Sequence, residues 1–103
     1  MSETIVNEAS SIQIGVAFFD FSGNAEVPNS VSYSIADAID GTTLSTGTVS
    51  PASSVTISPS STVNVIRHGR SFERRRINVS ASFTTGQLDG ECSWQVKNLG
   101  FTT

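Results

Sequence analysis

The chain has 103 residues, which suits a single domain with one core. Charged residues make up only 15% of it and the formal charge is −3 at pH 7, which argues against a protein whose whole surface binds nucleic acid. No segment approaches the roughly 20 apolar residues needed to cross a membrane, and no signal-peptide pattern is present at the start. We therefore expect a protein that is made in a reducing cytoplasm without a secretion signal.

The first ten residues are polar and lack a periodic pattern, apart from Ile5 and Val6. This composition predicts that residues 1–10 form a flexible arm, in which Ile5 and Val6 contact a partner by entering a groove or extending a sheet edge. From residue 11 to 21 apolar residues alternate with small or polar ones, which predicts a strand with one buried face. The adjacent aromatics Phe18 and Phe19 change the phase and predict a bulge or a change of sheet.

The middle of the chain contains three further strand patterns and one ambiguous segment. Residues 30–36 alternate and predict a half-buried strand, and residues 42–49, poor in apolar residues but rich in Thr, predict an edge strand. Residues 55–57 predict a short strand that ends before Pro59. Residues 60–66 fit a strand or a helical turn capped by a serine, and we favour a short helical or irregular crossover.

The last third of the chain begins with a predicted polar loop, residues 67–73. Residues 77–83 show the clearest alternation, and residues 84–90 predict a hairpin connection to a last strand. In that strand Cys92, Trp94 and Val96 form the predicted inward face. Cys92 is the sole cysteine, so no intrachain disulfide can form, and its position predicts a buried thiol.

Six or seven short strands with regular turn signals and no convincing helix predict an all-β fold of two packed antiparallel sheets. The sandwich is expected to span residues 11–99, followed by a tail at residues 100–103. The predicted core consists of the apolar residues on one face of the clearest strands: Ile14, Val16, Tyr33, Ile35, Ile77, Val79, Phe83, Trp94 and Val96.

Basic residues are concentrated in one segment: five of the six Lys and Arg residues lie within ten positions, Arg67, Arg70, Arg74, Arg75 and Arg76. Two interpretations remain open. Arg74, Arg75 and Arg76 are the solvated start of a strand with weak acidic partners, or Arg67, Arg70 and Arg74 form a patch that binds acidic groups of another subunit.

No residue pattern indicates catalysis. His68 is the sole histidine, it lies in a polar loop, and Ser71 and Glu73 beside it are a weak match to a catalytic triad. Asp37 and Asp40 fit a turn, with calcium binding there as the minor alternative. We therefore predict a protein that is not an enzyme and that has no cofactor and no metal site.

Four segments resemble a group of small immunoglobulin-like proteins encoded among the structural genes of tailed bacteriophages. They are residues 14–20 (IGVAFFD), 31–37 (VSYSIAD), 73–79 (ERRRINV) and 96–99 (VKNL). The resemblance implies an immunoglobulin-like β-sandwich of about seven strands. It also implies a virion component, present in many copies, that contacts the major capsid protein or other virion subunits.

A capsid decoration or cement protein is therefore the expected function, and a head-to-tail or tail subunit is the alternative within the virion. Two other classes stay open. An immunoglobulin-like carbohydrate-binding or adhesion module would need exposed aromatic residues. A nucleic-acid-binding module using the arginine loop, which we consider less fitting, would show steeply salt-dependent DNA binding.

Overall fold

The computed structural model describes residues 4–20, 22–84 and 86–99. These ranges contain seven strands and one short 3-10 helix: β1 (Thr4–Asn7), β2 (Ile14–Ala17), β3 (Ser30–Asp37), β4 (Thr43–Val49), β5 (Ser54–Ile57), η1 (Ser61–Asn64), β6 (Phe72–Phe83) and β7 (Gly86–Lys97). The prediction of an all-β fold with about seven strands is confirmed. Among the described residues, no helix is long and apolar enough to span a bilayer.

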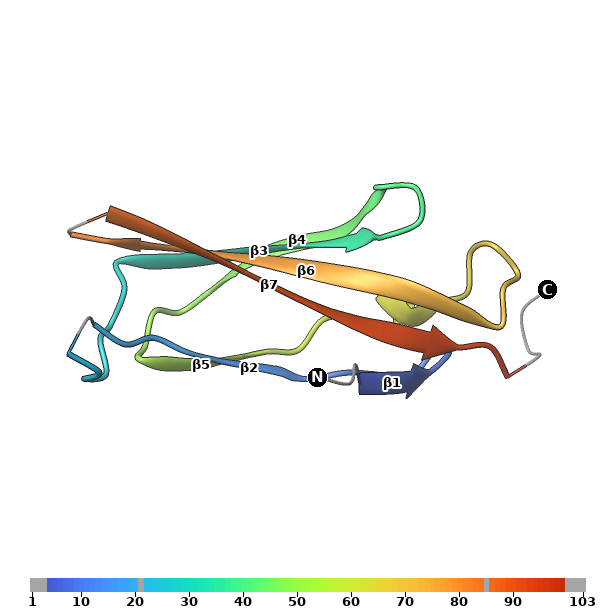
Figure 1. Ribbon diagram of the computed structural model, residues 1–103, viewed down its shortest axis with the longest axis horizontal. Helices are drawn as coiled ribbons and strands as arrows, with labels where there is room; N and C mark the ends of the chain where they lie inside the picture. Colours follow the sequence, from blue (N-terminus) through green and yellow to red (C-terminus); the bar gives the residue numbers. More distant parts are fainter. Residues whose placement is uncertain (1–3, 21, 85, 100–103) are drawn as a thin grey trace.

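The strands form two layers (Figure 1). One sheet has five strands in the order β1-β7-β6-β3-β4, and the other pairs β2 with β5. Neighbouring strands are antiparallel except at one place, where β1 runs parallel to the end of β7 and Thr4 pairs with Trp94. The expected sandwich is therefore present, while the expectation of purely antiparallel sheets is wrong at β1.

The N-terminal segment is part of the sandwich and not a free arm, which corrects the predicted domain boundary at residue 11. β1 adds to the edge of β7, and the carboxylate of Glu8 accepts a hydrogen bond from the N–H of Leu99 at 2.7 Å. Val6 is buried in the core, whereas Ile5 is 58% exposed. Residues 1–3 and the predicted tail, residues 100–103, lie outside the described residues.

The core lies between the two sheets. Of the nine predicted core residues, Ile35, Ile77, Val79, Trp94 and Val96 are buried, and Ile14, Val16, Tyr33 and Phe83 are partly buried against them. The remaining buried apolar side chains are Val6, Phe18, Val31, Val55, Ile57, Val63, Ile66 and Ala81. The alternation therefore identified the faces correctly, and β5 and η1 add residues that the pattern did not single out.

Several local predictions are also confirmed. β4 is an edge strand, and the crossover contains η1, whose start is capped by Ser60. The predicted change of phase at the two phenylalanines is wrong, because the buried Phe18 and the 59% exposed Phe19 continue the alternation of β2, which itself ends at Ala17. Phe19 forms an isolated bridge with Ala25. The chain leaves the core surface at that point.

The long hairpin of β6 and β7 differs from the prediction in its limits. β6 begins at Phe72, five residues before the predicted Ile77, because its pairing with β7 continues from Phe83 opposite Gly86 to Phe72 opposite Lys97. β7 likewise begins at Gly86, so the connection is shorter than the predicted segment 84–90. Regular pairing thus extends into the arginine-rich segment.

Cys92 is exposed, so the prediction of a buried thiol is wrong. Its partner across the hairpin, Ile77, is fully buried. β1 pairs only with residues 94–97 of β7, which leaves residues 86–93 as the outer edge of the sheet. An alternating pattern identifies a face, but a residue on that face is buried only where another layer covers it.

Candidate functional site

Charged side chains gather at one end of the sandwich, where the turn from β3 to β4 approaches the loop from η1 to β6. The end of β3 contributes Asp37, the turn contributes Asp40, the loop contributes Arg67 and His68, and the start of β6 contributes Glu73 and Arg75. We call these six residues the charged cluster. The turn and the loop lie at the right-hand end in Figure 1.

Glu73 organises the loop from the inside. Its side chain points inward from β6, where its carboxylate accepts hydrogen bonds from the N–H groups of Arg67 at 2.9 Å and His68 at 2.7 Å, and a longer one from Arg70 at 3.4 Å. Burial by itself would raise the pKa of Glu73, but these N–H groups and Arg75 outweigh it and lower the pKa below its usual 4.5. Glu73 is therefore an internal anion that holds the loop backbone.

Arg75 is the matching internal cation and is completely buried. Its Nη2 lies 3.2 Å from Oε1 of Glu73, its Nε donates to the carbonyl of Val63 at 2.8 Å, and Nη2 also donates to the carbonyl of Val65 at 2.8 Å. A buried charge is tolerated only when it is paired and its donors are satisfied. The guanidinium meets this condition by joining β6 to the backbone of η1 and of the residue that follows it.

Asp37 connects the turn to the loop. Its carboxylate is buried and accepts hydrogen bonds from the N–H of Ile39 at 2.8 Å and from Nη1 of Arg67 at 2.6 Å. Nε2 of His68 lies 2.8 Å from the same carboxylate. Burial would raise the pKa of Asp37, but the bonds from Ile39, His68 and Arg67 and the charge of Arg75 lower it below its usual 3.8.

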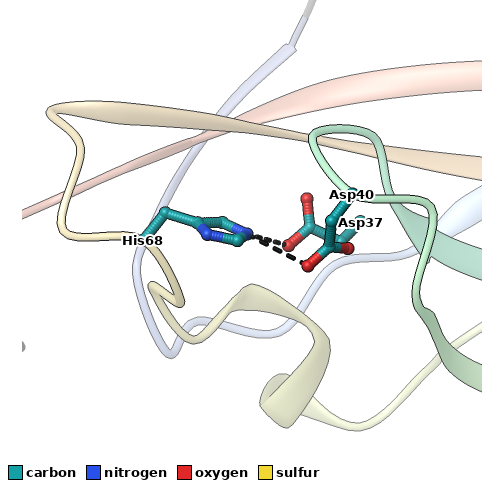
Figure 2. Close-up of side chains that lie close together, drawn as sticks. All are labelled: Asp37, Asp40 and His68. Carbon is teal, nitrogen blue, oxygen red and sulfur yellow. Dashed lines mark hydrogen bonds and ion pairs between the residues drawn. The ribbon is translucent and has the colours of Figure 1, made fainter.

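Figure 2 shows the ring of His68 directed at both carboxylates of the turn. One ligand atom from each of Asp37, Asp40 and His68 lies within 4.8 Å of the others, the kind of spacing that a metal ion needs. However, Nη1 of Arg67 already lies 2.6 Å from Asp37 and 3.2 Å from Asp40. A cation would have to displace this guanidinium, so the geometry is that of an ion-pair network.

The residues predicted to bind a partner come from two places, Arg67, Arg70 and Arg74 from the loop and the start of β6, and Ile5 and Val6 from β1. Arg67 is engaged by Asp37 and Asp40, and Val6 is buried in the core. Arg70, Arg74 and Ile5 are exposed, and a role for them in binding stays a prediction. The interpretation of Arg75 as a solvated residue at the start of a strand is wrong, since β6 begins earlier and turns this side chain inward.

The opposite end of the sandwich contains an apolar groove. It is lined by Phe19, Phe83, Gly86 and Leu88, with Asp20, Glu26 and Gln87 at its polar margin. We call these seven residues the apolar groove. Phe19 is 59% and Leu88 55% exposed.

The groove is open because the sandwich is incomplete there. Leu88 pairs with the buried Ala81, so its side chain points to the inner side of the sheet, yet β7 is the outer edge at this position. Phe83 packs edge to face on Phe18, with ring centroids 6.0 Å apart and an interplanar angle of 71°. This contact supports the floor of the groove from the core.

Sequence reasoning missed both features. The inward direction of Glu73 and Arg75 could have been found by extending the alternation of Ile77 backwards along β6. No comparable signal joins Asp37 to Arg67, which is 30 positions away. The groove combines residues from both layers, and only the missing cover over β7 distinguishes Leu88 from a core residue.

Comparison of the chain with known proteins found no matching family model, no similar curated protein and no similar solved structure. The charged cluster satisfies its own groups, whereas the apolar groove exposes side chains that a partner can cover.

Proposed function

We propose that this chain is a structural subunit of a tailed-phage particle, a decoration protein that binds the major capsid protein through the apolar groove. The resemblance of its strand segments to small immunoglobulin-like phage proteins supports the proposal that it is part of a phage particle. The observation that carries the binding mode is the exposure of Phe19 and Leu88 beside a partly buried Phe83. In this role the chain works by binding and not by catalysis.

The groove has the character of a contact surface. Two large apolar side chains, Phe19 and Leu88, lie more than half exposed in the groove. Val27, which is 60% exposed, follows the groove residue Glu26, and the nearby Asn29 donates its N–H to the carbonyl of Ser82 in β6. Single exposed apolar residues are ordinary, but a contiguous group with a polar margin is typical of an interaction site. Many copies on a repetitive shell would gain avidity from even a small contact.

The charged cluster supports binding through the groove, because its role is to stabilise the domain and not to contact the shell. Its buried carboxylates are matched within the chain, and Nη1 of Arg67 is held by Asp37 and Asp40. The cluster therefore gives the domain rigidity at one end and leaves the other end for the shell.

The test measures how many copies bind to purified particles that lack this subunit. The double substitution Phe19→Glu with Leu88→Glu places two charges in the groove, and we expect it to abolish binding, since an unpaired charge in a desolvated interface is costly. The matched control is Ile39→Glu with Val65→Glu, which adds the same charge at exposed apolar residues near the charged cluster. The control should bind like the wild type.

Equal occupancy by the groove variant and the wild type contradicts this binding mode. Loss of binding in both variants indicates a general effect of negative charge and also contradicts it. The number of copies separates the virion roles, because hundreds per particle indicate decoration of the shell. Six, twelve or a few dozen copies would instead support the head-to-tail or tail alternative.

A second candidate follows from the same groove. An exposed aromatic ring, Phe19, beside the polar groups of Glu26 and Gln87 is the arrangement that a carbohydrate-binding module uses to stack and hydrogen-bond a sugar. Binding of the wild-type protein to an array of bacterial surface polysaccharides, lost on Phe19→Ala, would favour this function. Binding to particles without any affinity for sugars favours the shell.

A further inference from the structure

β4 presents an unusually open edge. It closes the five-stranded sheet on one side, and among the described residues only β3 pairs with it. Its seven residues, Thr43–Val49, contain no charge and no proline. Edge strands are commonly protected by charges, proline, short length or bulges. One such device is present, an irregular register at Ile35 and Ala36, and it leaves residues 45–49 regularly paired.

The other free edges of the two sheets are protected. β1, β2 and β5 have only four residues each. The free part of β7, residues 86–93, is long, but it carries Asp89 and Glu91. Two copies of that edge would bring like charges together, which opposes pairing. Among the free edges of the described strands, β4 is therefore the one that is both long and without charged side chains.

The side chains of β4 favour an identical partner. Thr46 and Thr48 are exposed on the outer face of the sheet, and threonine pairs across antiparallel strands are favourable. On the inner face the ring of Tyr33 covers Gly47, where an added Cβ would lie 2.7 Å from the tyrosine oxygen. Two identical strands that pair antiparallel are related by a two-fold rotation axis, so the assembly closes as a dimer.

We propose that β4 pairs antiparallel with β4 of a second copy of this chain, joining two five-stranded sheets into one continuous sheet. The interaction consists of backbone hydrogen bonds and threonine contacts. It uses the edge of the sheet and not the apolar groove, so it does not depend on the proposed binding to a capsid. Because each copy carries a net charge of −3, the association should strengthen as salt screens their repulsion.

The experiment measures the mass of the full-length protein by sedimentation equilibrium over a range of concentrations and salt, with reductant present because Cys92 is exposed. Wild type should form dimers. Thr46→Lys with Thr48→Lys should raise the dissociation constant about tenfold or more, and Thr46→Glu with Thr48→Glu should do the same. Mixing the Lys and Glu variants should restore dimers, which shows that both remain folded.

The matched control is Ser32→Lys with Asn78→Lys, which adds the same charge to exposed positions on the interior strands β3 and β6. It should dimerise like the wild type in moderate salt. The proposal is overturned if wild type stays monomeric up to about 1 mM in high salt. It is equally overturned if the β4 variants dimerise like wild type, if the control loses dimers to the same extent, or if the mixture of Lys and Glu variants stays monomeric.

Discussion

The two ends of this sandwich differ in which side chains are buried and which are exposed. The charged end buries three charged side chains, and each of them is paired with oppositely charged groups of the same chain: Asp37, Glu73 and Arg75. At the groove end, Phe19 and Leu88 are apolar and more than half exposed. The polar residues are thus inside and the apolar residues outside, which reverses the usual arrangement.

The comparison shows that residue type alone does not identify a contact surface. The arginine-rich segment is the most unusual feature of the sequence, yet one of its arginines is buried and another is paired with two aspartates. The groove residues are ordinary by type and unusual by their exposure. What separates the two ends is whether the protein itself satisfies the side chains, and the following predictions test that distinction.

The largest expected effect is at Arg75. Replacing it by Met removes the cation while roughly keeping its volume, and it leaves Glu73 and two backbone carbonyls without their buried donor. We expect the free energy of unfolding to fall by about 3–5 kcal/mol in urea denaturation. Arg76→Met, on the other face of β6, is the control and should cost less than about 1 kcal/mol. Equal losses at both positions would refute the buried pair.

A smaller loss is expected at Asn64, which connects the core residue Trp94 to the segment after β1. Its Oδ1 accepts a hydrogen bond from Nε1 of Trp94 at 2.7 Å, and its Nδ2 donates to the carbonyl of Ser10 at 2.7 Å. Asn64→Ala should cost about 1–3 kcal/mol because buried polar groups lose their partners. Urea denaturation measures the loss, and Asn78→Ala, at an exposed position, should change little. A neutral result for Asn64→Ala would remove this link from the account.

The charged cluster also predicts how stability depends on pH. The pKa values of Asp37 and Glu73 are lowered in the folded protein, so their contribution is complete above the usual values of 3.8 and 4.5. It is lost as the pH falls through the folded-state values, because the unfolded chain then binds protons more readily. Unfolding in urea between pH 6 and pH 2 should therefore show a steep loss below about pH 4.5.

The variant Asp37→Asn should show a flatter dependence over that range, although it is less stable at neutral pH. Asp89→Asn, at an exposed position on β7, is the control and should keep the slope of the wild type. If Asp37→Asn and wild type lose stability in parallel as the pH falls, the acid sensitivity has another source.

The smallest effect on folding is expected in the apolar groove. Phe19→Ser and Leu88→Ser should each lower the free energy of unfolding by about 1 kcal/mol or less, since less than half of each side chain is removed from water. The same substitutions should weaken binding to particles far more than they weaken the fold. A large loss of stability on either substitution would show that the groove is part of the core.

Much of the fold was predictable because strand alternation reports which side of a strand is apolar. The strands around Ile35, Ile77 and Trp94 were identified in this way, and so were the edge position of β4 and the crossover at η1. The limits of β6 were less predictable, because charged side chains mask the continuation of a strand. Backbone pairing with β7 determined where β6 begins.

The candidate sites depended on tertiary structure to a greater degree. The sequence by itself determined an all-β chain with one core and placed charge at one segment. Only the tertiary structure decided that Arg67 bonds to Asp37 and that β1 pairs parallel with β7 and buries Val6. It also decided that Leu88 and Cys92 stay exposed although they lie on the inward face of β7. The physical reason is that burial and ion pairing depend on what lies opposite a residue, and the opposing groups here come from distant parts of the chain.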